Sequence, residues 1–431
     1  MFYLLAFFLS VASPLLAKPG ERVQVTNGDD GRKTCTVLPV GGEENDVPNI
    51  REAFEVCGKD GSIVFPEGHQ YWIAEKLHVT LDSSNVEWRG EWKFSPDMDY
   101  WRNNSYFIEF QNHRAAFIIS GTGFSIDGYG TGGIHGNGDV WYDHDAGPPS
   151  SEGRPMPFVL WNTSDSTVNN FYITQSQFWS FNIMNGTNLS FEDITCDSLS
   201  VNAPDDENWN QNVDGFNTMD ARNISLNNFK YRGGDDCIAI KPRSFDVRIN
   251  NFSCEGGNGV AIGSLGQYLE DNTVENIAIT NGKLTRHAWD MHSFYIKTWM
   301  GHLVDQGTEG DAYESGGEPR GGGWGKVRNI FVENLELDGV EDGPLINQDN
   351  GVQDSGFEGT SKIEVSHLYF RNFTGVLKDD GPIANFRCSK VWPCHHIYVE
   401  DMENLIGSDG SCKWADEETI FGVPGCSDSL G

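Results

Sequence analysis

The sequence predicts an all-β protein, most simply a single-stranded right-handed parallel β-helix, on three observations. The 431 residues include 50 glycines and 12% aromatic residues, with few of the Leu- and Ala-rich stretches typical of helices. A seven-residue motif of alternating polar and apolar residues recurs along the chain. Polar motifs flanked by glycine follow one another at equal steps. Short strands that recur in this way favour a solenoid of stacked coils.

The N-terminus has the character of a secretory signal peptide. Residues 1–17, MFYLLAFFLSVASPLLA, form an apolar run that ends in small residues, and we expect cleavage after Ala17. No later apolar run reaches membrane-spanning length. We therefore predict a secreted, extracellular chain, with residues 18–431 forming one domain and the protein a monomer. The Gly-rich, acidic segment 301–326 interrupts the repeat, and we interpret it as an excursion from one coil.

The nine cysteines fit an oxidising compartment, and their odd number leaves one unpaired. Short loops favour Cys388–Cys394 and Cys412–Cys426. The other expected pairs are Cys237–Cys254 and Cys35–Cys57, which would leave Cys196 free. No CxxC pair is present, which argues against a zinc site. Seven Asn-x-Ser/Thr sequons are candidate glycosylation sites: Asn103, Asn162, Asn185, Asn188, Asn223, Asn251 and Asn372.

The formal net charge of −33 argues against nucleic acid as a partner and indicates a protein soluble in a mildly acid medium. An acidic protein can still bind a polyanion where cations cluster in its cleft.

The repeated motif has the form polar–apolar–x–apolar–x–Asn/Asp–apolar. Its copies are NLSFEDI (188–194), NISLNNF (223–229), DVRINNF (246–252), NIAITNG (276–282), NIFVENL (329–335), HLYFRNF (367–373) and HIYVEDM (396–402). Each copy alternates with period two, which predicts a short half-buried strand. A β-sandwich is the alternative, but it would favour close-spaced Asn-Gly or Asp-Gly hairpin turns, which are sparse here.

Three polar motifs, QNVDGFN, GGDDCIAIK and GGNGVAIGSLGQ, contain Asp214, Asp236 and Asn258. The steps between these residues are 236 − 214 = 22 and 258 − 236 = 22. Strands of neighbouring coils lie about 4.8 Å apart, so equal steps bring such residues onto one wall.

The double aspartate adds a constraint. In a regular strand Asp235 and Asp236 would point to opposite faces, and Asp236 would share the buried face of Ile238. Gly233 and Gly234 give the backbone freedom to turn, so both carboxyls can reach the outer wall. Crowded carboxyls raise the pKa of one of them, which yields an acid beside a base, as glycosidic cleavage requires. Each aspartate taken singly could equally well solvate a turn.

The strings NVDGFN, GGDDCIAIK, GNGVAIGSLGQ and YIKTW resemble, in order, the four signature motifs of glycoside hydrolase family 28, the polygalacturonases. Residues 123–143 and 346–351 are also similar to that family, and the resemblance spans about residues 35–426. It implies a right-handed parallel β-helix that hydrolyses α-galacturonosyl bonds of pectin with inversion, without a metal or other cofactor.

The resemblance also implies roles for single residues. Asp235 matches the general acid, and Asp214 and Asp236 match the pair that activates water. Lys297 matches a lysine that binds a substrate carboxylate. Further candidate substrate-binding residues in these motifs are Asn258, Tyr295, Asn212 and Lys241.

Two positions depart from the common family pattern. Asn258 stands where most members have histidine, and it can hydrogen-bond but cannot titrate. Tyr295 stands where arginine is usual, so the bidentate carboxylate clamp is lost there. Arg243 or Arg286 could replace that arginine, or Tyr295 could stack on a sugar ring. Aromatic candidates for sugar contact, with a core role as the alternative, are Trp179 and Trp299.

Both departures resemble a fungal exo-acting subgroup, so we predict exo-release of terminal galacturonic acid from α-1,4-galacturonan. The retained Asp-Asp pair favours galacturonan, with an exo-rhamnogalacturonan galacturonohydrolase or an endo-polygalacturonase as alternatives. Segment 301–326 either closes one end of the cleft or has no part in specificity. Two other classes stay open: a calcium-dependent pectate lyase, because three acids could imitate a calcium site, and a non-catalytic pectin-binding β-helix.

Overall fold

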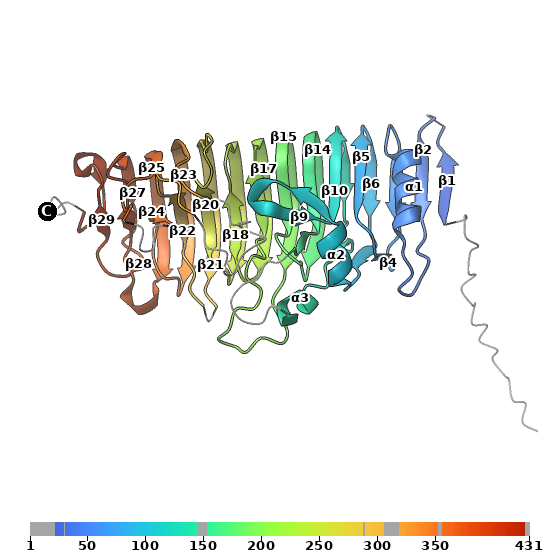
Figure 1. Cartoon of the computed structure of the whole chain (residues 1–431), viewed down its shortest axis with the longest axis horizontal. Helices are drawn as coiled ribbons and strands as arrows, with labels where there is room; N and C mark the ends of the chain where they lie inside the picture. Colours follow the sequence, from blue (N-terminus) through green and yellow to red (C-terminus); the bar gives the residue numbers. More distant parts are fainter. Residues whose placement is uncertain are drawn as a thin grey trace, which may run out of the picture.

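The computed structural model describes residues 22–29, 31–144, 153–287, 289–305, 319–351 and 356–426. Within these ranges the strands of neighbouring coils pair in parallel in one 27-stranded sheet. Figure 1 shows them stacked side by side along the long axis, from the blue N-terminal end to the red C-terminal end. The predicted parallel β-helix is confirmed, and the sandwich alternative is wrong. Residues 1–17 lie outside the described ranges, so the signal peptide stays a prediction.

Each coil contributes strands to the walls of the helix. The wall that carries the polar motifs contains β16 (Phe216–Met219), β18 (Asp236–Ile240), β20 (Gly259–Leu265), β22 (Phe294–Trp299), β24 (Leu345–Asn350), β26 (Asn385–Arg387) and β29 (Ser411–Lys413). The long bent strands are β14 (Phe158–Thr174), β15 (Phe181–Asp197), β17 (Arg222–Arg232), β19 (Phe245–Glu255), β21 (Val274–Thr285), β23 (Trp324–Asp338), β25 (Lys362–Val376) and β27 (His395–Glu400).

Shorter elements build the two ends. The first coils contain β1 (Val23–Asn27), β2 (Lys33–Val37), β3 (Ser62–Phe65), β4 (Gln70–Ile73), β5 (Leu77–Asp82), β6 (Asn85–Trp88), β7 (Glu91–Phe94), β10 (Phe117–Thr122), β11 (Ser125–Asp127) and β12 (Gly133–His135). The last coils add β28 (Leu405–Ile406) and β30 (Ile420–Phe421). The helices are α1 (Val47–Cys57), α2 (Met98–Asn104) and α3 (Asp139–His144), with 3-10 turns η1 (Phe110–Asn112), η2 (Lys378–Asp380) and η3 (Glu417–Thr419).

The coil length follows the spacing of the polar motifs. Phe216 in β16 pairs with Ile238 in β18, and Ile238 pairs with Val260 in β20, so both steps are 22 residues. The next step, from Val260 to Phe294 in β22, is 34 residues, yet the strands still pair in parallel. The interior contains one continuous apolar cluster from Cys35 to Cys426.

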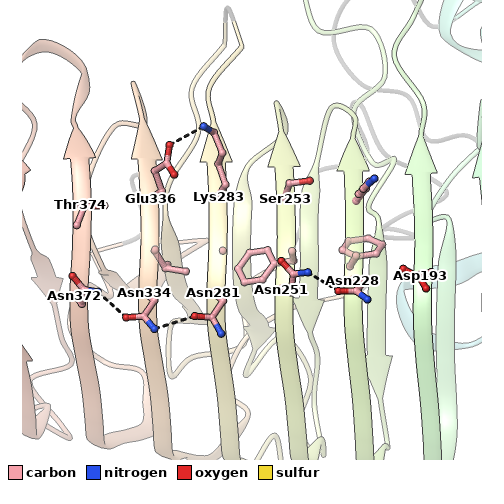
Figure 2. Close-up of a pocket in the computed structure, with 15 residues that line it drawn as sticks. Asp193, Asn228, Asn251, Ser253, Asn281, Lys283, Asn334, Glu336, Asn372 and Thr374 are labelled. Atoms are coloured by element: carbon pink, nitrogen blue, oxygen red, sulfur yellow. Dashed lines mark hydrogen bonds and ion pairs between the residues drawn. The ribbon is translucent and has the colours of Figure 1, made fainter.

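The repeated motif encodes corners as well as strands. In all seven copies the first and sixth residues have positive φ angles, for example 55° at Asn223 and 54° at Asn228. Asn is one of the few non-glycine residues that tolerate this left-handed region, which explains its recurrence at both positions. The corner amides also hydrogen-bond from coil to coil (Figure 2). Asn334 Nδ2 donates to Asn281 Oδ1 at 3.0 Å, and Asn372 Nδ2 donates to Asn334 Oδ1 at 2.7 Å.

The cysteines pair as the sequence indicated. The disulfides are Cys35–Cys57, Cys237–Cys254, Cys388–Cys394 and Cys412–Cys426, and Cys196 is free and buried. The second of these joins β18 to β19 directly behind the double aspartate.

A small three-stranded sheet lies outside the coils. It contains β8 (Tyr106–Ile108), β9 (His113–Ala115) and β13 (Pro155–Met156). A separate apolar cluster joins it to the wall, in which Ile108 and Met156 pack with Trp179 and Met219. In Figure 1 the ribbon labelled β9 crosses in front of the central strands, and η1 connects β8 to β9 in the chain.

Candidate active site

A cavity of about 170 Å³ lies on the wall that carries the polar motifs. Its lining includes six of the candidate site residues: Asn212, Asp214, Asp235, Asp236, Lys241 and Lys297. The other lining residues are Gln111, Trp179, Gly263, Ser264, Gln267, Trp299 and Arg320. Asn258 and Tyr295 do not line it but hydrogen-bond to Asp235 and Asp236.

A strand irregularity turns both aspartates outward. The register of β18 against β20 shifts between Asp236 and Ile238. As a result Cys237 and Ile238, although consecutive, both pack into the interior, while Asp236 lines the cavity. An extra residue in one strand re-aims its neighbours in this way. The outward position of Asp236 therefore comes from the bulge at Cys237, in addition to the glycine pair that the sequence indicated.

The Asp235 carboxylate accepts four hydrogen bonds from three residues, including a 3.4 Å bond from Asn212 Nδ2. Its Oδ1 accepts from Asn258 Nδ2 at 2.9 Å and from the Asp236 amide at 2.8 Å, and its Oδ2 accepts from the Asn212 amide at 2.8 Å. Burial, and after it the charge of Asp236, raises the pKa of Asp235. Asn258 thus orients this carboxyl without titrating.

Asp214 forms a buried ion pair. Its Oδ2 lies 3.4 Å from Lys241 Nζ, and the two side chains are 3% and 6% exposed. The ammonium also lies over the Trp179 ring, 3.9 Å from its centroid. Burial raises the pKa of Asp214 well above its ordinary value, and the positive charge of Lys241 opposes this rise.

Asp236 is hydrogen-bonded by Tyr295, whose hydroxyl donates to Asp236 Oδ1. The tyrosine is 5% exposed and packs on Ala239, Ala261 and Leu345. Burial raises the pKa of Tyr295 well above its ordinary value, so the phenol keeps the proton that it donates. Its ring offers no open face for a sugar.

Neither Arg243 nor Arg286, which the sequence analysis named as possible replacements for the family's arginine, contributes to the cavity. Arg243 pairs with Asp220 and with Glu270, the latter at 3.0 Å, and Arg286 pairs with Glu341 at 3.2 Å. Neither arginine lines the cavity.

Arg320 lines the cavity instead, from the described base of the excursion 301–326. Sequence reasoning missed Arg320, and it also missed Gln111 and Gln267. Gln267 is the last residue of the motif GGNGVAIGSLGQ and could have been singled out there, whereas no motif contains Gln111 or Arg320. Residues 306–318 of the excursion lie outside the described ranges.

A larger hollow, of about 620 Å³, lies elsewhere. Figure 2 shows that the asparagine corners line it, together with Lys283 and Glu336, which form a 2.7 Å ion pair. It contains none of the three catalytic candidates. The smaller cavity is therefore the candidate active site.

In the described ranges, no three His, Cys, Asp or Glu side chains are grouped as metal ligands would be. The three cavity aspartates each have a different partner, Lys241, Asn258 or Tyr295, and do not converge on one point as calcium ligands do. None of the helices in those ranges has the length and apolar character needed to cross a membrane.

The sequons lie on the surface of the coils. Asn372 is half-buried, and the remaining six asparagines are exposed. Glycosylation at these positions stays a prediction.

The chain is similar to several proteins of known name or structure. The chain is 50% identical over 408 residues to "Putative galacturan 1,4-alpha-galacturonidase C" of Aspergillus niger, covering 93% of this chain and 95% of the relative. It is 32% identical over 409 residues to "Alpha-L-rhamnosidase rgxB" of the same species, covering 93% and 90%. The solved endo-xylogalacturonan hydrolase of Aspergillus tubingensis has the same fold, with a TM-score of 0.73 and 23% identity over 91% of this chain and 99% of that one.

Residues 62–307 match the family described as glycosyl hydrolases family 28. The match covers more than half of the chain and includes all three aspartates of the cavity. The fold is accordingly a right-handed parallel β-helix. The chain belongs to glycosyl hydrolase family 28 and is a glycoside hydrolase.

Proposed function

We propose that the protein is a secreted, exo-acting glycosidase that releases terminal galacturonic acid from α-1,4-galacturonan with inversion. The observation that carries the proposal is one small cavity that combines three catalytic carboxyls with Lys297 and Arg320, in a chain of net charge −33. Cations gathered at this point favour an anionic sugar. The 50% identical relative has a name that denotes the same activity.

The three carboxyls have two different roles in catalysis, proton donation and activation of water. Asp235, whose pKa is raised by burial and by the charge of Asp236, protonates the glycosidic oxygen as the bond breaks. Asp236 and Asp214 activate a water molecule that attacks the anomeric carbon from the other side. The Asn212 Oδ1 atom is buried without a hydrogen-bond partner in the free enzyme, which suits it to a sugar hydroxyl.

Two features of the cavity, its small volume and the glutamine bridge in its wall, support exo-acting cleavage. Gln111 Nε2 in η1 donates to Gln267 Oε1 at 2.5 Å, which joins the small sheet to the segment after β20. Both glutamines line the cavity, so this bridge forms part of its wall. Its volume of about 170 Å³ is below the roughly 300–1,000 Å³ of ordinary ligand pockets, and suits a single sugar residue.

The pH dependence of activity tests the role of Asp235. We expect kcat/KM to fall as the pH rises through the pKa of Asp235, because the general acid then loses its proton. This alkaline limb lies above the roughly 3.9 of an ordinary aspartate, since burial and Asp236 raise the pKa. The check is kcat/KM for trigalacturonate across a pH series. Activity that keeps rising with pH would contradict this assignment.

A second candidate function is cleavage of rhamnogalacturonan, because one relative has the name alpha-L-rhamnosidase. Incubation with polygalacturonate and, in parallel, with rhamnogalacturonan oligomers ending in galacturonate or in rhamnose distinguishes the candidates. We expect steady release of monomeric galacturonate from polygalacturonate with little loss of viscosity, reducing ends without unsaturated products, and no effect of a chelator. Rapid thinning indicates an endo-enzyme, unsaturated products indicate a lyase, and release of rhamnose supports the second candidate.

A further inference from the structure

The lining of the cavity includes a buried cation that the sequence analysis did not single out. Arg320 is only 8% exposed, and its guanidinium lies 5.9 Å from the ring centroid of Trp299, which lines the same cavity. The charge of Lys241, and after it that of Lys297, lowers the pKa of Asp214, and the charge of Lys297 lowers that of Asp235. Arg320 acts instead on His113, whose pKa is lowered first by burial and then by the charges of Lys241 and Arg320.

His113 contacts the glutamine bridge in the cavity wall through Gln111. Its Nε2 lies 2.9 Å from Gln111 Oε1 and donates to it, because an amide oxygen only accepts. Gln111 in turn donates to Gln267. Arg320 lines the same cavity as the two glutamines, and the amide of its neighbour Gly321 donates to the Gln267 carbonyl at 2.7 Å, so Arg320 lies near the glutamine bridge.

The backbone around Arg320 is fixed by four hydrogen bonds. Its amide and carbonyl pair with those of Val304, both at 2.9 Å. The next two amides donate to the Gln267 carbonyl at 2.7 Å and to the Met300 carbonyl at 2.9 Å. The guanidinium is thus presented from a rigid base. This pre-organisation reduces the entropy lost when a ligand binds.

A sugar residue in this cavity brings a carboxylate that needs a partner. Lys241 is engaged by Asp214 and by the Trp179 ring. A guanidinium presents a planar fork of donors that matches both oxygens of a carboxylate, and a flat aromatic neighbour orients that fork. We propose that Arg320 binds the carboxylate of the terminal galacturonate residue and so selects unesterified chain ends. This inference rests on the proposed function and extends it to the recognition of one group.

The variant Arg320→Gln tests this assignment. We expect its KM for trigalacturonate to rise about 10- to 100-fold with a smaller change in kcat, because a charged hydrogen-bonded pair is lost while the carboxyls stay in place. Arg320→Lys keeps the charge without the fork, and its KM should lie between those of the wild type and Arg320→Gln. Arg243→Gln is the matched control, since Arg243 pairs with Asp220 and Glu270 outside the cavity, and it should keep the wild-type KM.

A second measurement separates carboxylate recognition from a structural effect. Galacturonic acid and its uncharged methyl ester are compared as competitive inhibitors of each enzyme. In the wild type the acid should bind more tightly than the ester, and in Arg320→Gln that preference should disappear while the Ki of the ester stays unchanged. An Arg320→Gln enzyme with wild-type KM, or one that loses affinity for acid and ester equally, overturns the inference. A wild-type enzyme that hydrolyses no galacturonide overturns the proposed function instead.

Discussion

Replacing Asp235 by Asn is expected to lower kcat for galacturonan oligomers by about 10³- to 10⁴-fold, because general acid catalysis contributes roughly this much and the amide has no proton to transfer. Binding should persist, since the amide is isosteric and the backbone donors of Asn212 and Asp236 stay in place. Single-turnover rates and calorimetric titration with trigalacturonate measure the two effects separately.

The control for this variant is the same substitution at an exposed corner. Asp165 accepts a hydrogen bond from Asn188 Nδ2 at 2.8 Å, far along the chain from the polar motifs. Asp165→Asn should keep full activity, because an amide oxygen can accept the same bond. An Asp235→Asn enzyme with more than a tenth of the wild-type kcat would remove Asp235 from the acid role, whereas a wild type inactive on every pectic polymer would favour a non-catalytic protein.

The substitution Lys241→Met is expected to have the largest effect on stability. It leaves Asp214 buried without its cation, and removal of one member of a buried pair costs about 3–5 kcal/mol. The pKa of Asp214 is already raised by burial, and loss of Lys241 raises it further. A carboxyl with a raised pKa is stable in its protonated form at low pH and loses that stabilisation as the pH rises. The deficit in Lys241→Met should therefore grow with pH and shrink in acid.

Thermal unfolding at several pH values measures this deficit. The double variant Asp214→Asn, Lys241→Met should recover most of the lost stability, because no buried charge is left uncompensated. Lys283→Met is the control at the surface: Lys283 and Glu336 are 53% and 60% exposed, so loss of this ion pair should change the thermal stability far less than Lys241→Met does. A deficit in Lys241→Met that is independent of pH would show that the ion pair is not its source.

The sequence predicted those parts of the molecule that depend on regular spacing. The 22-residue steps fixed the alignment of β16, β18 and β20, and with it the meeting of Asp214 and Asp236. The alternating motif predicted its strands, but not that its first and sixth residues are corners, because period two does not distinguish a turn residue from an outward strand residue.

The rest of the site depends on contacts between distant segments. Gln111 and Gln267 are 156 residues apart, and Arg320 reaches the cavity only because its excursion returns across the end of β22. Such contacts follow from loop conformations that no local pattern records. The bulge at Cys237 is likewise a property of the pairing between β18 and β20 rather than of either string alone.

Because the coils differ in length, the turns that border the cleft can change without a change in the alignment of the catalytic residues. The step from Val260 to Phe294 is twelve residues longer than the two before it (34 − 22 = 12), yet Gly263 and Lys297 remain paired in the cavity wall. Turns between strands can thus grow or shrink while the reacting groups keep their alignment. On such a scaffold, changes in turn length can alter which polymers bind while the catalytic residues and the cleavage step stay the same.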